Sequence, residues 1–190
     1  MEHCEALIIG GSAGSLNVLL KVLPSLNAQL SFPVVIVIHR KKGTDSLLPE
    51  LLSGRTQLIV KEAQEKEELL PGTVYVAPSD YHLLLERNRT FSLDFSEKVN
   101  FSRPAIDLTF QTAAEVYKDK LVCLLLSGSN SDGVNGLKTA LEWGGRVLIQ
   151  NPEDAQVAFM PQQAMLQVKT DFILNAEDMA EFINLLSKTQ

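Results

Sequence analysis

The fold of this chain is organised around one stretch near its start, Ala6-Leu7-Ile8-Ile9-Gly10-Gly11-Ser12-Ala13-Gly14-Ser15. Its first four residues form a short apolar run, which is typical of a buried strand, and residues 16–23 have helical spacing. The small residues between them therefore predict a sharp turn from strand to helix. The frame Gly10–Gly14 spells G-x-S-x-G, which is the frame of a nucleophile elbow with Ser12 as its reactive side chain.

A glycine-rich turn of this kind also occurs in proteins that bind nucleotide phosphates. A dinucleotide site requires Gly-x-Gly-x-x-Gly and an acidic residue at the end of the second strand. Here the second apolar run ends in His39-Arg40, and no Gly-Lys-Ser/Thr follows the turn, which excludes a P-loop. The stretch by itself leaves three alternatives open, namely a serine nucleophile, a nucleotide loop and a turn without a ligand.

Composition narrows the class of protein. A chain of 190 residues with 45% hydrophobic residues is expected to form one domain with a substantial core. No apolar run approaches the roughly 18 residues of a membrane span, and no signal peptide is evident, so we expect a cytoplasmic protein. In that compartment Cys4 and Cys123 are expected to be free thiols in the core. A net charge of -6 with few aromatic residues argues against general nucleic-acid binding. No Cys/His cluster has the spacing of a metal site.

Apolar runs alternate with helical patterns along most of the chain, which predicts a doubly wound, three-layer α/β/α fold with a mostly parallel sheet. Strands are expected at 6–9, 34–38, 57–61, 73–77, 121–126, 146–149 and 171–174. Helices are expected at 15–23, 45–52 (capped by Thr44), 105–117, 134–143, after Pro161 and at 177–186. Residues 82–86 and 91–95 predict an antiparallel β-hairpin at the edge of this sheet, and the acidic segment 63–70 is expected to be exposed.

Three predicted strand ends carry reactive side chains, namely Ser12, His39 and Asp132. Ligands of open α/β sheets bind outside the carboxyl ends of the strands. A hydroxyl nucleophile needs a base, and the base needs an acceptor on its other ring nitrogen. We therefore expect Ser12 Oγ near His39 Nε2 and the Asp132 carboxylate near Nδ1. Alternatively, His39 is a polar residue where a strand meets water, and Asp132 caps the following helix.

The order Ser, His, Asp along the chain differs from the order Ser, Asp, His of the α/β-hydrolases, so an esterase here would belong to another lineage. The chain resembles the catalytic domain of the CheB-type chemotaxis methylesterases over essentially its whole length. Several motifs carry the resemblance, in order along the chain. They are the turn Gly10–Ser15, the strand end Val37-Ile38-His39, the segment Pro71–Pro78 with His82 after it, Arg103-Pro104-Ala105-Ile106-Asp107, the loop Leu126–Leu137 and Met160-Pro161.

The resemblance implies a serine hydrolase that demethylates glutamate methyl esters on chemoreceptor helices and that in many members deamidates receptor glutamines. It implies Ser12 as the nucleophile, His39 as the base and Asp132 as the residue that orients His39. Backbone N–H groups at Ala13 and Ser129 would bind the oxyanion, and Arg103 and Met160 are candidate substrate contacts. It implies no metal or organic cofactor, and its partners would be methylated receptor helices and a receptor methyltransferase.

The chain departs from the family pattern at several motif positions. Ala13 stands for Thr, Ser129 for Met, Asn130 for Gly and Ser102 for His. Because Asn tolerates left-handed backbone, we expect the loop around Asn130 to keep its shape. Many members carry a receiver domain ahead of the esterase, and because the first predicted strand begins at Ala6 we expect a single esterase domain without a receiver domain here.

One further expectation concerns the basic residues that follow His39. Arg40, Lys41 and Lys42 follow His39 in an otherwise acidic chain. They predict either a basic lip, with Arg40 among the substrate contacts, that steers acidic receptor helices, or a solvated loop without this role.

Two alternative functions stay open at this point. One is a catalytically impaired domain of the same fold that docks to receptors or to a methyltransferase, and the other is a nucleotide-binding α/β protein.

Overall fold

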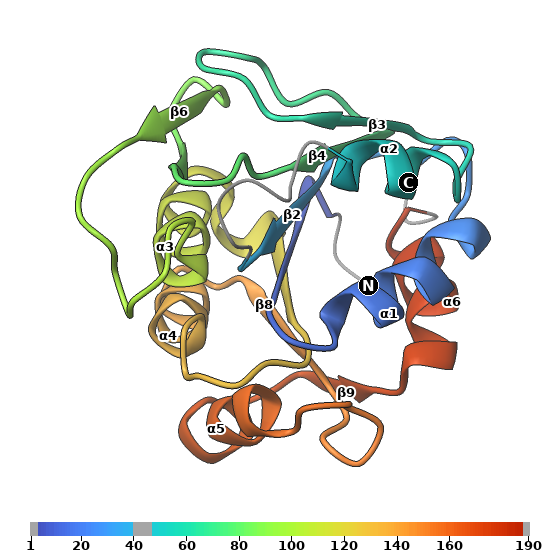
Figure 1. Cartoon of the computed structure of the whole chain (residues 1–190), viewed down its shortest axis with the longest axis vertical. Helices are drawn as coiled ribbons and strands as arrows, with labels where there is room; N and C mark the ends of the chain where they lie inside the picture. Colours follow the sequence, from blue (N-terminus) through green and yellow to red (C-terminus); the bar gives the residue numbers. More distant parts are fainter. Residues whose placement is uncertain (1–3, 40–46, 188–190) are drawn as a thin grey trace.

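The computed structural model describes residues 4–39 and 47–187 of the chain (Figure 1). Within them a sheet of seven strands has the order β3-β4-β2-β1-β7-β8-β9, and every neighbouring pair is parallel. Its strands are β1 (Ala6–Gly11), β2 (Val34–Ile38), β3 (Ile59–Glu62), β4 (Thr73–Val76), β7 (Leu121–Leu125), β8 (Arg146–Gln150) and β9 (Phe172–Leu174). The predicted doubly wound parallel sheet is confirmed.

Helices cover both faces of this sheet, as Figure 1 shows. One face is covered by α1 (Ser15–Val22), the short 3-10 helix η1 (Leu23–Ser25), α2 (Leu48–Ser53) and α6 (Ala176–Leu186). The other face is covered by α3 (Ile106–Tyr117), with the 3-10 turn η2 (Lys118–Lys120) after it, α4 (Val134–Glu142) and α5 (Phe159–Gln167). The Thr44 cap and the start of the helix predicted at 45–52 lie outside the described residues.

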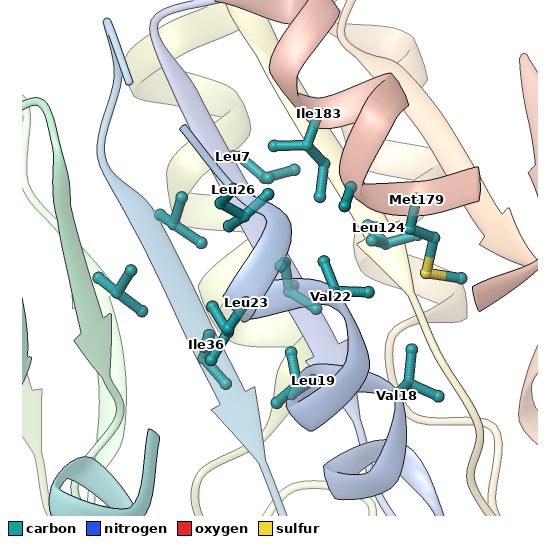
Figure 2. Packing of buried hydrophobic residues seen from close by; sticks show 14 of the residues in the cluster. Leu7, Val18, Leu19, Val22, Leu23, Leu26, Ile36, Leu124, Met179 and Ile183 are labelled. Atoms are coloured by element: carbon teal, nitrogen blue, oxygen red, sulfur yellow. The ribbon is translucent and has the colours of Figure 1, made fainter. Parts of the chain in front are cut away.

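The strands are apolar on both faces because each face is covered by a separate core. Along β1, Leu7 and Ile9 belong to the core under α1 and α6, whereas Ala6 and Ile8 belong to the core under α3 and α4. Figure 2 shows the first of these cores, where side chains of α1, η1 and α6 meet the sheet. Cys4 and Cys123 are buried and free, as predicted.

The predicted β-hairpin is present, but its expected place at the edge of the main sheet is wrong. The strands β5 (His82–Leu85) and β6 (Phe91–Asp94) form a separate two-stranded antiparallel sheet. Leu83 and Phe91 are fully buried and join the core under α3, because the hairpin packs onto that helix instead of extending the sheet. The preceding segment 63–70 is only partly exposed, since Ala63 and Leu69 are buried in the same core.

The strand order reverses at β1, because the chain pairs β2 on one side of β1 and β7 on the other. A crevice outside the carboxyl ends of the strands at such a switch point is the usual ligand site of open α/β folds. The segments that follow β1, β2 and β7 all reach this edge, and they carry Ser12, His39 and Asp132. None of the helices in the described residues has the length and apolar character needed to span a bilayer.

Candidate active site

Backbone hydrogen bonds join the loops at the switch point into one unit. The N–H of Ser12 donates to the carbonyl of Ser127 at 2.9 Å, and the N–H of His39 donates to the carbonyl of Gly11 at 3.2 Å. The hydroxyl of Ser127, which is fully buried, also donates to the carbonyl of Ala13 at 2.7 Å. The turn after β1 is therefore fixed relative to the ends of both neighbouring strands.

His39 and Asp132 meet at this edge although 93 residues separate them in the chain. His39 Nε2 lies 2.7 Å from Asp132 Oδ2, and the exposed fractions of the two side chains are 12% and 0%. The ring nitrogens are reversed relative to the sequence-based expectation, which placed the carboxylate at Nδ1. With Nε2 donating to the carboxylate, Nδ1 is left as the acceptor, and Ser102 Oγ lies 3.4 Å from it.

Ser12 lies at the same edge on the half-buried turn after β1. Its Oγ makes no hydrogen bond to His39 or to any other described residue, so the hydroxyl is not held by a partner within the described part of the chain. The turn depends on Gly14, whose φ of 85° lies in the left-handed region that side chains disfavour. Gly128 lets the loop after β7 pass close to this turn, because a Cβ on it would stand 3.0 Å from Ser12 Cβ and 2.5 Å from Met160 Cε.

Asp132 accepts hydrogen bonds on both carboxylate oxygens. Oδ2 accepts from His39 and from the N–H of Ile106 at 2.7 Å, and Oδ1 accepts from the N–H of Asp107 at 3.0 Å. Burial alone would raise the pKa of Asp132, but the hydrogen bonds from His39 and from these two N–H groups outweigh it and lower the pKa below its usual value. The alternative that Asp132 caps the helix after it does not hold, because Asp132 caps the start of α3 instead of α4.

A second buried carboxylate faces Asp132, and reasoning from the sequence did not assign it a role. Asp107 lies in the first turn of α3, and its Oδ1 accepts from the N–H groups of Gly133 at 2.9 Å and Gly136 at 2.8 Å. Asp107 thus caps α4 while Asp132 caps α3. Burial is the largest influence on Asp107 and raises its pKa, with the nearby negative charge of Asp132 adding to the effect. Asn100 Nδ2 donates to Asp107 Oδ2 at 2.8 Å and to Asp132 Oδ1 at 3.2 Å.

The peptide N–H groups of Ala13 and Ser129, the expected oxyanion donors, make no hydrogen bond to another described residue. Each peptide plane is nevertheless held through its carbonyl. The carbonyl of Ser12 accepts from the N–H and the hydroxyl of Ser15 at 3.1 and 2.5 Å. The carbonyl of Gly128 accepts from the N–H of Met160 at 2.9 Å. Since N–H and C=O of one trans peptide point in opposite directions, these bonds set the directions of the two free donors.

The remaining predicted site residues lie in different surroundings. Met160 is fully buried beneath Gly128, where it supports the loop and offers no surface to a substrate. The guanidinium of Arg103 donates to Asp80 Oδ1 at 2.8 Å and to the carbonyl of Ser96 at 2.6 Å, and it stacks 4.0 Å from the ring centroid of Phe95. Arg103 therefore braces the loop before α3. Arg40, Lys41 and Lys42 lie outside the described residues, so the basic lip stays a prediction.

Asn130 acts differently from the sequence-based expectation. Its φ is not positive; instead, its side-chain oxygen accepts the N–H of Asp132 at 3.0 Å. The side chain of Gln150, fully buried at the end of β8, accepts the N–H of Ser127 at 2.9 Å. Gln150 belongs to none of the sequence motifs, and Ser127 lies within the loop Leu126–Leu137 but received no role from it. Only the folded structure reveals that both support the loop. In the described part of the chain, no group of three or more His, Cys, Asp or Glu side chains is arranged to hold a metal ion.

The chain is similar to a family of known proteins in both sequence and structure. The family model described as CheB methylesterase matches residues 7–183. A Thermotoga maritima protein-glutamate methylesterase/protein-glutamine glutaminase is 36% identical over 93% of this chain and 52% of that protein. A Leptospira interrogans protein, provisionally named for the same two activities, is 47% identical over 95% of this chain and 94% of that protein. The crystal structure of the Thermotoga maritima CheB methylesterase catalytic domain superposes with a TM-score of 0.92 at 34% identity, over 97% of this chain and 100% of that domain.

Proposed function

Because this chain belongs to the CheB methylesterase family, we propose that it is a protein-glutamate methylesterase that hydrolyses glutamate methyl esters on the cytoplasmic helices of chemoreceptors. In this proposal Ser12 is the nucleophile, His39 the base and Asp132 the residue that orients it. The observation that carries the proposal is the 2.7 Å hydrogen bond between His39 and the fully buried Asp132, at the strand end next to Ser12. Membership of the family also removes the support for a nucleotide-binding protein.

The proposed reaction begins when Ser12 Oγ attacks the ester carbonyl carbon and its proton passes to His39. Because Nε2 is bound to Asp132, Nδ1 is the nitrogen that takes this proton. Asp132 holds the ring and stabilises the imidazolium that forms. Catalytic hydrogen bonds of an empty site often tighten only when substrate is bound, so an unengaged Ser12 hydroxyl is compatible with this role.

The tetrahedral intermediate places a negative charge on the former carbonyl oxygen. The N–H groups of Ala13 and Ser129 are free to bind it, and both peptide planes are already held through their carbonyls. As the intermediate collapses, the C–O bond to the methoxy group breaks, and Nδ1 returns its proton to release methanol. Water, activated by the same nitrogen, then cleaves the acyl-serine and leaves a glutamate carboxylate. With a glutamine substrate the leaving group is ammonia.

A direct test measures methanol release from a methylated receptor fragment. We expect the wild-type chain to release methanol and Ser12→Ala to lose activity by on the order of 10⁴-fold or more, because the substitution removes the nucleophile.

The same assay separates the alternative function. A catalytically impaired domain would bind the receptor fragment but release no methanol in either form. Equal methanol release by wild type and Ser12→Ala would contradict the assignment of the nucleophile.

A further inference from the structure

The turn at residues 99–102 lies beside the proposed triad. The backbones of Val99 and Ser102 exchange two hydrogen bonds, of 3.2 and 2.9 Å. Asn100 and Phe101 at its tip have φ of 50° and 61°, which is left-handed backbone. Asn is among the residues that tolerate this conformation best, whereas Phe is not. The turn therefore puts the Asn100 side chain at a defined place, with Phe101 97% exposed beside it.

The Asn100 side chain bridges two buried carboxylates. Its Nδ2 lies 2.8 Å from Asp107 Oδ2 and 3.2 Å from Asp132 Oδ1. A side-chain amide has two N–H groups, so it can donate one to each carboxylate. Among the described residues, Asn100 is the side chain that donates hydrogen bonds to both of them. Two like charges in a buried site repel each other strongly, and a shared donor stabilises the pair.

We propose that Asn100 is a positioning residue for catalysis, and this proposal rests on the proposed function of the triad. By donating to Oδ1 beside the N–H of Asp107, the amide helps to hold the Asp132 carboxylate in the rotation in which Oδ2 faces His39 Nε2. The same turn carries Ser102, whose Oγ lies 3.4 Å from His39 Nδ1. The turn at residues 99–102 therefore acts on both sides of the His39 imidazole. Asn100 holds the Asp132 carboxylate on the Nε2 side, and Ser102 lies beside Nδ1, the nitrogen that takes the proton.

Two substitutions separate this role from a role in shaping the backbone. Asn100→Gly deletes the amide while keeping a residue that accepts left-handed φ. Asn100→Asp keeps the size of the side chain but replaces the donor with a third carboxylate. Phe101→Gly is the matched control, because it lies in the same turn with the same kind of φ and makes no hydrogen bond to the carboxylates.

The readouts are kcat and KM for methanol release, thermal unfolding, and the low-field NMR signal of the imidazole proton that faces Asp132. We expect Asn100→Gly to lower kcat about tenfold and Asn100→Asp about 100-fold, with KM within about twofold of wild type, since small misplacements of a catalytic group have effects of this size. The NMR signal should shift or broaden in both variants. Phe101→Gly should keep the wild-type kcat and NMR signal.

An unchanged kcat and an unchanged imidazole signal in folded Asn100→Gly would overturn the proposal, and so would equal losses in Asn100→Gly and Phe101→Gly. If Asn100→Gly does not fold, Asn100→Asp decides by the same criteria. The NMR measurement needs no substrate. It therefore tests the positioning role even if the wild-type chain releases no methanol, which is the result that would contradict the proposed function instead.

Discussion

Asp132 and Asp107 are two buried aspartates that perform the same structural task in opposite directions. Each accepts two backbone N–H groups at the start of a helix, Asp132 from α3 and Asp107 from α4. Each also accepts from the amide of Asn100. Their pKa values nevertheless move in opposite directions, with that of Asp132 lowered and that of Asp107 raised.

The difference between the two aspartates is the hydrogen bond from His39, which only Asp132 receives in the described structure. Desolvation favours the neutral form of both carboxyls, and a donor that carries or gains a positive charge reverses the balance for one of them. Helix capping therefore explains why both aspartates are buried, and the histidine explains why one of them belongs to a candidate active site.

The largest effect should come from removing this difference. We expect His39→Ala to lower methanol release by on the order of 10⁴-fold or more, because the base is lost. The pKa of Asp132 should then rise, as that of Asp107 does, because its strongest favourable hydrogen bond is gone. The rate and the Asp132 carboxyl titration, followed by NMR, check the two effects. Ser12→Ala is the control, since it should abolish activity and leave the Asp132 titration in place.

The same change made at each aspartate should separate catalysis from capping. Each oxygen of Asp132 accepts a backbone N–H, so the NH₂ of Asp132→Asn faces a donor in either orientation. We expect it to lower kcat by about 10³- to 10⁴-fold, since the partner of His39 is lost. It should also cost about 1–3 kcal/mol of unfolding free energy, the usual effect of an unsatisfied buried polar group.

Asp107→Asn can keep its oxygen on the N–H groups of Gly133 and Gly136, which leaves its NH₂ against Asn100. We expect a similar cost of about 1–3 kcal/mol but a loss of less than about tenfold in kcat. Urea unfolding and methanol release measured on both variants test this contrast. Equal losses of kcat would mean that the two carboxylates share one function.

The smallest effect should appear in the pH dependence of stability. An acid whose pKa is lowered by folding stabilises the folded state above its unfolded value, and this contribution is lost as pH falls below about 4. The difference in unfolding free energy between wild type and Asp132→Asn should therefore shrink below about pH 4. For Asp107 the raised pKa has the opposite sign, so the difference between wild type and Asp107→Asn should grow as pH falls toward about 4. Parallel curves for the two variants would contradict this assignment of the shifts.

Much of the architecture could be predicted from local sequence, because runs such as Val34–Ile38 are apolar on both faces, as strands buried in a parallel sheet are. The place of the hairpin at 82–94 could not, because an alternating pattern shows that two strands pair but not what covers them. Leu83 and Phe91 are equally suited to packing on a sheet edge or on α3, and in the folded chain they join the core under α3.

From the amino-acid sequence one can predict that a serine, a histidine and an aspartate follow parallel strands, and parallel strands bring their carboxyl ends to one edge. The folded chain was needed to show which nitrogen of His39 meets Asp132, that Asp132 caps α3, and that Asn100 joins Asp132 to Asp107. Strand positions depend on local burial patterns, whereas contacts among side chains from separate loops depend on how α3 and α4 pack at their first turns, which no single segment encodes.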